Sequence, residues 1–448
     1  MKKKFLSLLL FVFLLITPQV SSIYNWSEPI KLNSDSSHDS YRACVGLDST
    51  NTFHVAWKDN SDIIKADADW DIFYKNKQGL NWSNTTVVTP FSFNDSTCLS
   101  MTIDKKDMIH VAWKDDSDIL HSGSDWDIFY TYKTNASSTW SQPVLISKNS
   151  TGVCSCPSIS TDNDGSVHIS YADTTYAYDN DSDSDIIYTF KTKNKPWTQP
   201  QLVTGNSTKN AIDTCITTDN SGNVHLVWYE MDEANDSSEI MYTLKQTNSA
   251  WHKPTRISSS EQGYSVDPWI TVDTKNNIHL IWNDNTNLFD NGRDYDIFYR
   301  IKNFDQSWSN ITLISKDSTS NCKWPTMYIG NSNTVFVAWS DKTGYTDTNN
   351  DYDIVYTYTN QTHNWPKVQV VTQKSIYNSN WPRFTVDTNG LIHMTWWDRF
   401  PDQWVTYYCM GTPVPNEILP EKNTPLQITS VLILSIIILS IFFKKYKI

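Results

Sequence analysis

The sequence predicts an all-β fold, a seven-bladed β-propeller closed by its own N-terminal strand, with a signal peptide before it and a C-terminal transmembrane helix after it. Three observations support the propeller. A marker of the form His-x-x-Trp or a close variant, followed two residues later by an acid, recurs seven times at spacings of 54 to 58 residues. The first six units each contain four short runs of β-branched and aromatic residues. The last unit lacks its fourth run, and a matching run stands near the start of the chain.

Residues 1–22 have the composition of a secretory signal peptide. Three lysines at 2–4 precede an apolar run from Phe5 to Ile16, and Pro18 and the small residue Ser22 follow. This order of charged, apolar and small segments is typical of an export signal. We therefore expect cleavage after Ser22 and an extracellular mature chain.

Residues 23–411 hold the seven units of the predicted propeller. In each unit the first strand leads through a tight turn into a second strand that carries the marker, and the third strand resembles Asp-Ile-Phe-Tyr. The fourth strand opens with Trp. The markers are His54/Trp57, His110/Trp113, His168/Tyr171, His225/Trp228, His279/Trp282, Phe336/Trp339 and His393/Trp396. Four-stranded units that repeat radially bury both faces of each sheet against their neighbours, which is the propeller architecture.

The two ends of this region predict how the ring closes. The seventh unit stops after the run from Trp404 to Cys409, whereas the run from Trp26 to Leu32 has the Trp-Ser-x-Pro form of a fourth strand. We expect the N-terminal strand to complete the last blade through main-chain hydrogen bonds. An open solenoid would gain nothing from such an arrangement.

The C-terminal region predicts a membrane anchor. Four prolines make residues 412–425 an extended stalk. Residues 426–443 are almost wholly apolar and long enough to cross a ~30 Å hydrocarbon layer, and three lysines follow in the tail at 444–448. The positive-inside bias places that tail in the cytoplasm and the propeller outside, as a single-pass protein of the cell surface.

Charge limits the choice of partners. The chain has 36 basic and 49 acidic residues, and six of its lysines lie in the two ends, so the external part carries a net charge of −19. Nucleic acid is therefore excluded as a partner, and the membrane is contacted only through the anchor. Frequent Asn-x-Ser/Thr sequons are typical of an exported glycoprotein.

These strands resemble those of the sialidase-like, BNR-repeat propellers, in which a strand of the Asp-Ile-x-Tyr type precedes a Trp at the start of the fourth strand. The resemblance spans residues 24–411 but is degenerate. In that family an Asp-box of the form Ser-x-Asp-x-Gly-x-x-Trp fills the turn, and here only the Trp remains, as at Trp82. Active sialidases also have six blades and three arginines that bind a carboxylate. The resemblance therefore implies the fold, while a sialidase-like activity is not carried over.

Two rings of residues are expected on the face where the long loops emerge. The acidic ring lies two residues past each marker aromatic and consists of Asp59, Asp115, Asp173, Glu230, Asp284, Asp341 and Asp398. Its presence in every unit favours a structural role, in which the carboxylate accepts loop N–H groups. The recurring histidines occupy one mid-strand position, which favours packing over metal binding.

The channel ring lies twelve residues before each marker position and consists of Arg42, Cys98, Cys156, Asp213, Asp267, Trp324 and Trp381. A companion ring two residues further on consists of Cys44, Ser100, Ser158, Cys215, Trp269, Thr326 and Arg383. Trp faces stack on sugar rings while charged groups bind hydroxyls, so the sequence predicts a ligand site in blades five to seven. Its candidate residues are Trp269, Trp324, Trp381, Asp267, Arg383, Trp397, Asp398 and Arg399. Packing of these tryptophans between blades is an equal alternative.

The sequence leaves two further questions open, calcium binding and the pairing of cysteines in disulfides. Alternating carboxylates in two loops suit Ca²⁺, which takes six to eight oxygen ligands, although solvated acidic loops are the alternative. These residues are Asp67, Asp69, Asp71, Asp179, Asp181, Asp183 and Asp185. Export makes disulfides expected, and Cys98 with Cys154 or Cys156 could join adjacent blades.

The sequence thus favours a membrane-anchored binding or adhesion module for an extracellular glycan or protein ligand, with calcium as the one cofactor considered. A structural coat protein and a sialidase-like glycoside hydrolase are the two alternatives. No residue set in the sequence has the pattern of a catalytic centre.

Overall fold

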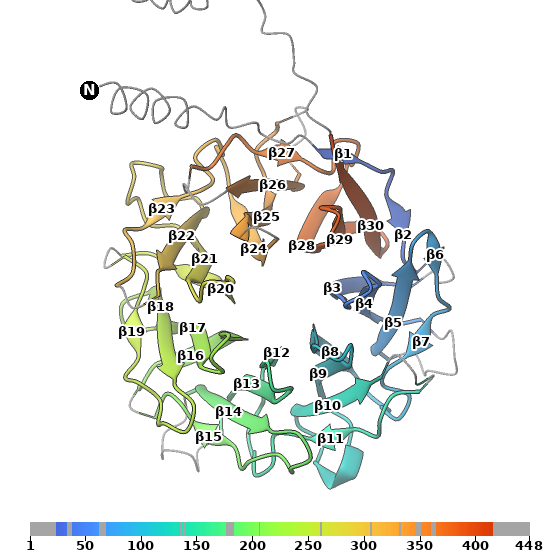
Figure 1. Ribbon diagram of the computed structural model, residues 1–448. Coiled ribbons are helices and arrows are strands. Elements are labelled where there is room, and N and C mark those ends of the chain that lie inside the picture. Colours follow the sequence, from blue (N-terminus) through green and yellow to red (C-terminus); the bar gives the residue numbers. More distant parts are fainter. Residues whose placement is uncertain are drawn as a thin grey trace, which may run out of the picture. The chain divides into compact units, whose positions relative to one another are not determined.

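Seven antiparallel sheets surround a central axis in the computed structural model of the chain, five of them with four strands and two with five (Figure 1). The structure describes residues 24–33, 38–61, 69–134, 137, 139–175, 183–205, 207–259, 262–304, 307–330, 333–345, 351–359 and 364–414. Residues Trp26–Thr412 form the compact unit that contains the blades. The prediction of an all-β, seven-bladed propeller is confirmed.

The first three blades follow the chain in order, and their innermost strand comes first. Blade one holds β3 (Ser40–Leu47), β4 (Phe53–Asp59), β5 (Asp71–Gln78), β6 (Asn81–Trp82) and β7 (Thr86–Val87). Blade two holds β8 (Ser96–Ile103), β9 (Ile109–Asp115), β10 (Asp127–Lys133) and β11 (Val144–Leu145), with the short 3₁₀ helix η1 (Ile119–His121) between β9 and β10. Blade three holds β12 (Ser158–Thr161), β13 (Val167–Asp173), β14 (Asp185–Lys191) and β15 (Gln201–Leu202).

The next three blades repeat the same antiparallel order. Blade four holds β16 (Asn210–Thr218), β17 (Val224–Asp232), β18 (Ser237–Lys245) and β19 (Thr255–Arg256). Blade five holds β20 (Ser265–Val272), β21 (Ile278–Asp284), β22 (Asp296–Lys302) and β23 (Thr312–Leu313). Blade six holds β24 (Cys322–Ile329), β25 (Val335–Asp341), β26 (Asp353–Thr359) and β27 (Gln369–Val370).

Blade seven combines the two ends of the propeller, as predicted. It holds β28 (Asn378–Val386), β29 (Ile392–Arg399) and β30 (Trp404–Pro413) together with β1 (Tyr24–Trp26) and β2 (Ile30–Lys31). Ile30 pairs with Tyr408, and the backbone N–H of Leu32 donates to the Thr406 carbonyl at 3.0 Å. A Cβ atom at Gly411 would come within 3.0 Å of the Trp26 ring, so glycine is what allows this close approach.

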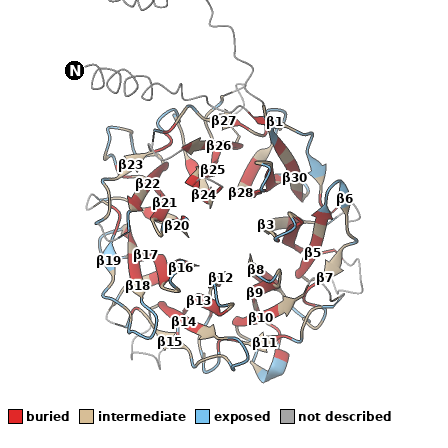
Figure 2. Cartoon of the chain, viewed as in Figure 1, coloured by how far each residue is buried: buried red, intermediate tan, exposed pale blue. Residues whose placement is uncertain are grey.

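The hydrophobic core lies between successive blades and is built mainly from the second and third strands (Figure 2). At the junction of blades seven and one, Leu32 and Tyr408 pack with Val55 and Trp57 in one buried cluster. The N-terminal segment therefore contributes to the core as well as to the sheet. Burial of such apolar surface is the main favourable term in folding.

In blades two to six the fourth strand is shorter than predicted and begins beyond the tryptophan that marks it, whereas in blades one and seven that tryptophan lies in a short strand of its own, β6 or β1. In blade two, Trp140 precedes the two-residue strand β11, and Pro143 lies between them. Proline has no N–H to donate, so it is tolerated on an outer edge strand but limits its pairing. The outer edge of each sheet is accordingly short.

The predicted signal peptide (1–22), transmembrane helix (426–443) and cytoplasmic tail (444–448) lie outside the described residues, as does all of the stalk but 412–414. Within the described ranges, the structure contains no helix of the length and apolarity needed to cross a membrane. Those parts of the prediction stay predictions.

Candidate functional site

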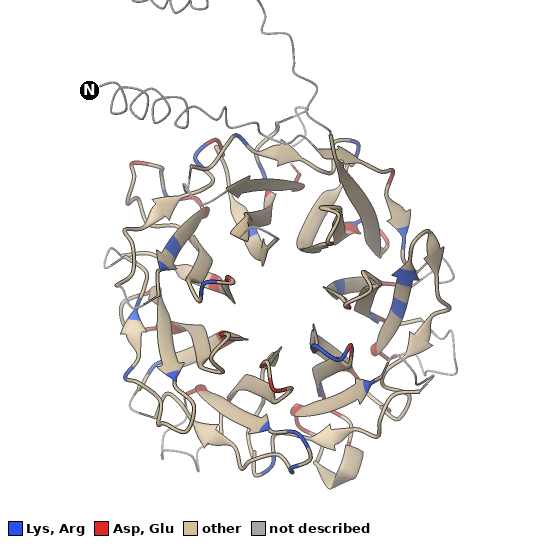
Figure 3. Cartoon of the chain, viewed as in Figure 1, with Lys and Arg blue, Asp and Glu red and all other residues tan. Residues whose placement is uncertain are grey.

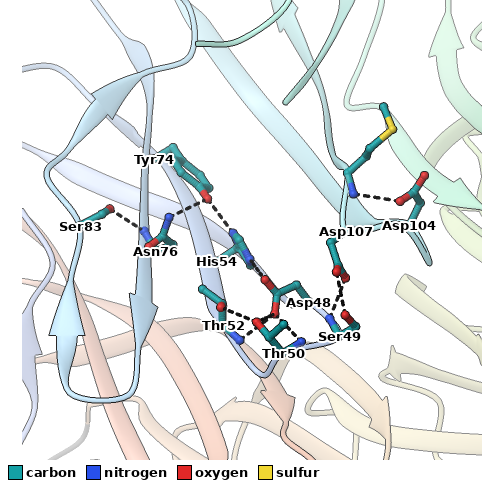
Figure 4. A network of polar contacts seen from close by, with 11 residues as sticks. Asp48, Ser49, Thr50, Thr52, His54, Tyr74, Asn76, Ser83, Asp104 and Asp107 are labelled. Carbon is teal, nitrogen blue, oxygen red and sulfur yellow. Dashed lines mark hydrogen bonds and ion pairs between the residues drawn. The ribbon is translucent and has the colours of Figure 1, made fainter. Parts of the chain in front are cut away.

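The recurring histidines belong to a buried network that supports the first turn of six of the seven blades, the exception being blade six with Phe336 at this position. In blade one, His54 Nδ1 lies 2.6 Å from the Tyr74 hydroxyl and Nε2 lies 3.3 Å from Asp48 Oδ2 (Figure 4). Although burial alone raises it, hydrogen bonds from Thr50, Thr52 and His54 lower the pKa of Asp48 to about 2. The same Tyr–His–Asp arrangement recurs at Tyr130/His110/Asp104, Tyr188/His168/Asp162, Tyr242/His225/Asp219, Tyr299/His279/Asp273 and Tyr408/His393/Asp387. These histidines are part of the architecture.

The acidic ring is also structural. In six blades the indole N–H of the marker Trp donates to the carboxylate two residues on, at 2.8 to 3.1 Å. All seven acids of this ring are buried, and Figure 3 shows how acidic residues are distributed around the whole propeller. Asp398 is the blade-seven member, accepts bonds from Trp396 Nε1 at 2.8 Å and Ser379 Oγ at 2.7 Å, and is buried. The structure therefore places Asp398 inside a blade and not among the residues that line the channel.

The channel ring is formed by a repeated β-bulge. The innermost strands β3, β8, β16, β20, β24 and β28 each shift register at the same point. The residue at the shift has a left-handed backbone in all six: Arg42 (φ 55), Cys98 (φ 49), Asp213 (φ 48), Asp267 (φ 52), Trp324 (φ 52) and Trp381 (φ 57). Bulky residues rarely adopt this conformation, and a bulge re-aims the side chain that it carries.

All seven members of the channel ring line one cavity of about 290 Å³ on the axis. The predicted residues Trp269, Trp324, Trp381, Asp267 and Arg383 are brought together there. The rings of Trp324 and Trp381 lie 5.3 Å apart, and the guanidinium carbon of Arg42 lies 4.6 Å from the centre of the Trp381 ring. Arg383 crosses toward blade five, with its guanidinium carbon 4.7 Å from the centre of the Trp269 ring. The volume is at the small end for ligand pockets.

The companion ring has different roles on the two sides of the cavity. In blades two and three its hydroxyls join neighbouring blades, since Ser100 Oγ accepts from Ile159 N–H at 3.3 Å and Ser158 Oγ accepts from Ile216 N–H at 3.1 Å. A disulfide between Cys98 and Cys156 also joins blades two and three, one of the two pairings that the sequence left open. Blades five and seven instead present Trp269 and Arg383 to the cavity.

Asp213 and Asp267 form an acid pair at adjacent positions of the channel ring. Burial and then the charge of Asp213 raise the pKa of Asp267 to about 7, although Arg383 opposes this. Burial also raises the pKa of Asp213, and Arg42 acts in the opposite direction. The sequence placed Asp213 in the channel ring but did not single it out as a site residue. The sequence does contain a signal for Asp213, because the next repeat has an acid, Asp267, at the same position.

Trp397 belongs to an aromatic cluster at the junction of blades seven and one, together with Tyr41, Trp70 and Trp404. The Tyr41 ring lies 4.6 Å from Trp404, 5.0 Å from Trp70 and 6.0 Å from Trp397. Sequence reasoning missed the other three, although an aromatic residue just before the third strand recurs at Trp70, Trp126, Tyr295 and Tyr352. Arg399 is exposed at the end of β29.

The structure tests only part of the calcium prediction. Asp67, Asp179 and Asp181 lie outside the described residues. Asp71 accepts a hydrogen bond from Thr89 Oγ1 at 2.7 Å and Asp185 accepts one from Thr204 Oγ1, so both are tied to the fourth-strand side of their blades. Within the described ranges, no group of three His, Cys, Asp or Glu side chains could hold a metal ion. Calcium binding stays a prediction.

No protein-family model matches the sequence, and neither does any curated protein. Solved structures do match. An ulvan lyase of polysaccharide lyase family PL25 has a TM-score of 0.56 at 11% identity, with 82% of this chain and 96% of the lyase covered. The polysaccharide lyase Uly1 has a TM-score of 0.51 at 11% identity, covering 90% and 94%. A protein of unknown function from Dyadobacter fermentans has a TM-score of 0.54 at 9% identity, covering 87% and 99%.

Sialidases are also among the structural matches, at TM-scores below 0.5. At this level of identity such likenesses show the fold alone. The expected resemblance to the sialidase-like propellers is confirmed at the level of the fold, and its low sequence identity agrees with a degenerate repeat.

Proposed function

We propose that this protein is a glycan-binding propeller anchored at the cell surface, and that one sugar unit of its ligand occupies the cavity on the axis. The observation that carries the proposal is the lining of that cavity, where Trp324 and Trp381 stand together beside Arg42 and Arg383. The export signal, stalk and anchor proposed from the sequence would present this face outside the cell.

The chemistry of the lining suits a carbohydrate. An indole face covers the apolar face of a pyranose, and guanidinium groups donate several hydrogen bonds in a planar fork to hydroxyls or to a carboxylate or sulfate substituent. Each arginine already packs on an indole ring, which orients its guanidinium before a ligand arrives. Pre-organised groups lose less entropy on binding.

The structural neighbours support the same class of ligand. Two of them are polysaccharide lyases, and the ulvan lyase structure has been determined bound to -[GlcA(1-4)Rha3S]-. The aromatic cluster of Tyr41, Trp70, Trp397 and Trp404 stands next to the channel ring in sequence, since Tyr41 precedes Arg42. It would carry a second sugar unit of a longer ligand.

The test is a glycan array, with acidic and neutral members, probed with the full-length protein in detergent. Wild type should retain a defined set of glycans, and Trp381→Ala should weaken that binding at least tenfold, which is about 1.4 kcal/mol. The matched control is Phe93→Ala, because Phe93 is 76% exposed and does not line the cavity. An array that stays empty for wild type would contradict the proposal and favour the structural coat protein.

A further inference from the structure

The acid pair of the channel ring is built differently from every other carboxylate described above. Asp213 on β16 and Asp267 on β20 come from neighbouring blades, and both line the cavity. The acids of the acidic ring are tied to a buried indole N–H, whereas these two are half-buried and face the space that a ligand would fill. Carboxyl groups that share a cleft and perturb one another are candidates for proton transfer.

The surroundings of the two carboxyls push their protonation states apart. Arg42 favours the ionised form of Asp213, while the charge of Asp213 favours the protonated form of Asp267. A pair in which one member stays protonated beside an ionised partner is the arrangement that separates a general acid from a general base. Asp267 is therefore suited to the role of acid and Asp213 to the role of base.

A buried amide fixes one oxygen of Asp267. Asn283 is 2% exposed and its Nδ2 donates to Asp267 Oδ2 at 2.8 Å. Asp267 lines the cavity while Asn283 lies behind it, so this bond holds the carboxyl in place from the blade side. A carboxyl that is held in one orientation before the ligand arrives loses less entropy on binding.

We propose that Asp213 and Asp267 are the catalytic pair of a glycoside hydrolase activity, which acts on the glycan held in the cavity. This inference rests on the proposed function and extends it from binding to cleavage. Asp267 donates its proton to the glycosidic oxygen as the bond from that oxygen to C1 breaks. Asp213 accepts a proton from the water whose oxygen bonds to C1. One water is consumed, two free sugar ends form, and the pair still holds one proton, which returns to Asp267 before the next cycle.

The activity should depend on the protonation of Asp267. The charged, titratable or hydrogen-bonding groups that act on it are Asp213 (β16), Tyr229 (β17), Asn283 (β21), Tyr295 (before β22), Lys323 (β24) and Arg383 (β28). Because the acid must be protonated, the rate should fall as the pH rises through about 7, the pKa of Asp267.

The experiment uses the full-length protein with ulvan and with every glycan that the array retains. New reducing ends are measured together with ultraviolet absorbance, which reports the unsaturated uronate that elimination produces. Wild type should release reducing ends without that absorbance. Asp267→Asn and Asp213→Asn should each slow release about a hundredfold or more, and the binding of each variant is measured on the same array so that the rates are compared at full occupancy.

The controls separate the possible failures. Asp164→Asn alters an exposed acid of a first-to-second turn and should keep the wild-type rate. Asp267→Glu keeps the carboxyl and should restore part of the rate, and thermal melting checks that each variant is folded. Binding by wild type without release of ends, unsaturated products, or full activity in the Asn variants would overturn the hydrolase. Absence of binding by wild type would instead overturn the proposed function itself.

Discussion

The acidic ring and the channel ring have the same number of members, one in each blade, yet they differ in almost every physical respect. In the acidic ring nearly identical residues are buried and bonded to a neighbouring indole. In the channel ring the residue type changes around the axis, from Arg through Cys and Asp to Trp. The backbone is left-handed at six of the seven positions.

This difference separates residues that build a blade from residues that use the space between blades. A role that every blade needs must be met seven times, so it appears as repetition. A ligand binds the ring in a single orientation, so the residues that contact it differ from blade to blade. Backbone strain at such residues persists where the surrounding structure enforces it.

The largest effect should come from the indoles that pair with the acidic ring. Trp282→Ala removes a fully buried side chain and the donor to Asp284. We expect the free energy of unfolding to fall by about 3–5 kcal/mol in denaturant titrations. Trp324→Ala, in the channel ring, should cost roughly 1 kcal/mol. Equal losses at the two positions would remove the distinction between the rings.

A smaller effect of opposite sign is expected at the acid pair. Asp213→Gly relieves a left-handed backbone and removes a half-buried carboxylate, so the free energy of unfolding should rise by about 1 kcal/mol while glycan cleavage is lost. Thr217→Gly, on the same strand, is the matched control and should destabilise, because its backbone has no positive φ to relieve. If Asp213→Gly also destabilises the fold, the channel ring supports the architecture after all.

The smallest effect is a pH dependence of stability within the blades. Burial raises the pKa of Asp71 to about 7, compared with about 3.9 in an unfolded chain. Between these values the folded state binds more protons, so the free energy of unfolding falls as the pH rises from about 4 to 7. In Asp71→Asn the loss between pH 5 and 8 should be smaller by on the order of 1 kcal/mol. Thermal melts at both pH values measure it, with exposed Asp402→Asn as the control, and an unchanged loss would contradict it.

Most of the fold could be predicted from the sequence because its determinants are periodic. The His-x-x-Trp marker repeats since six of the seven blades use the same buried indole and six use the same Tyr–His–Asp support for the turn. The closing strand could be predicted for the same reason, because the fourth strand missing from the last repeat stands at the N-terminal end of the propeller. The short fourth strands could not be predicted, because in blades two to six the tryptophan that marks them precedes the two-residue strand.

The candidate site could be predicted only as a set of positions. Counting back from the marker located the channel ring, and the cavity contains every member of it. The counting could not show that Asp398 is enclosed in a blade, that Asp213 perturbs Asp267, or that Arg383 reaches across to Trp269. Those relations depend on the bulge and on the tilt of neighbouring sheets, which a single blade's sequence does not encode.

The pairing of β2 with β30 bears on where the chain of the propeller could begin and end. The break in the backbone lies within one sheet, and Asn51 and Thr388 additionally bond blade one to blade seven. A linker that joins the end of β30 to the start of β1 would therefore permit new termini in another blade's first turn. The ring has no inherent first blade, and circularly permuted descendants of this chain could carry the same cavity in a different reading order.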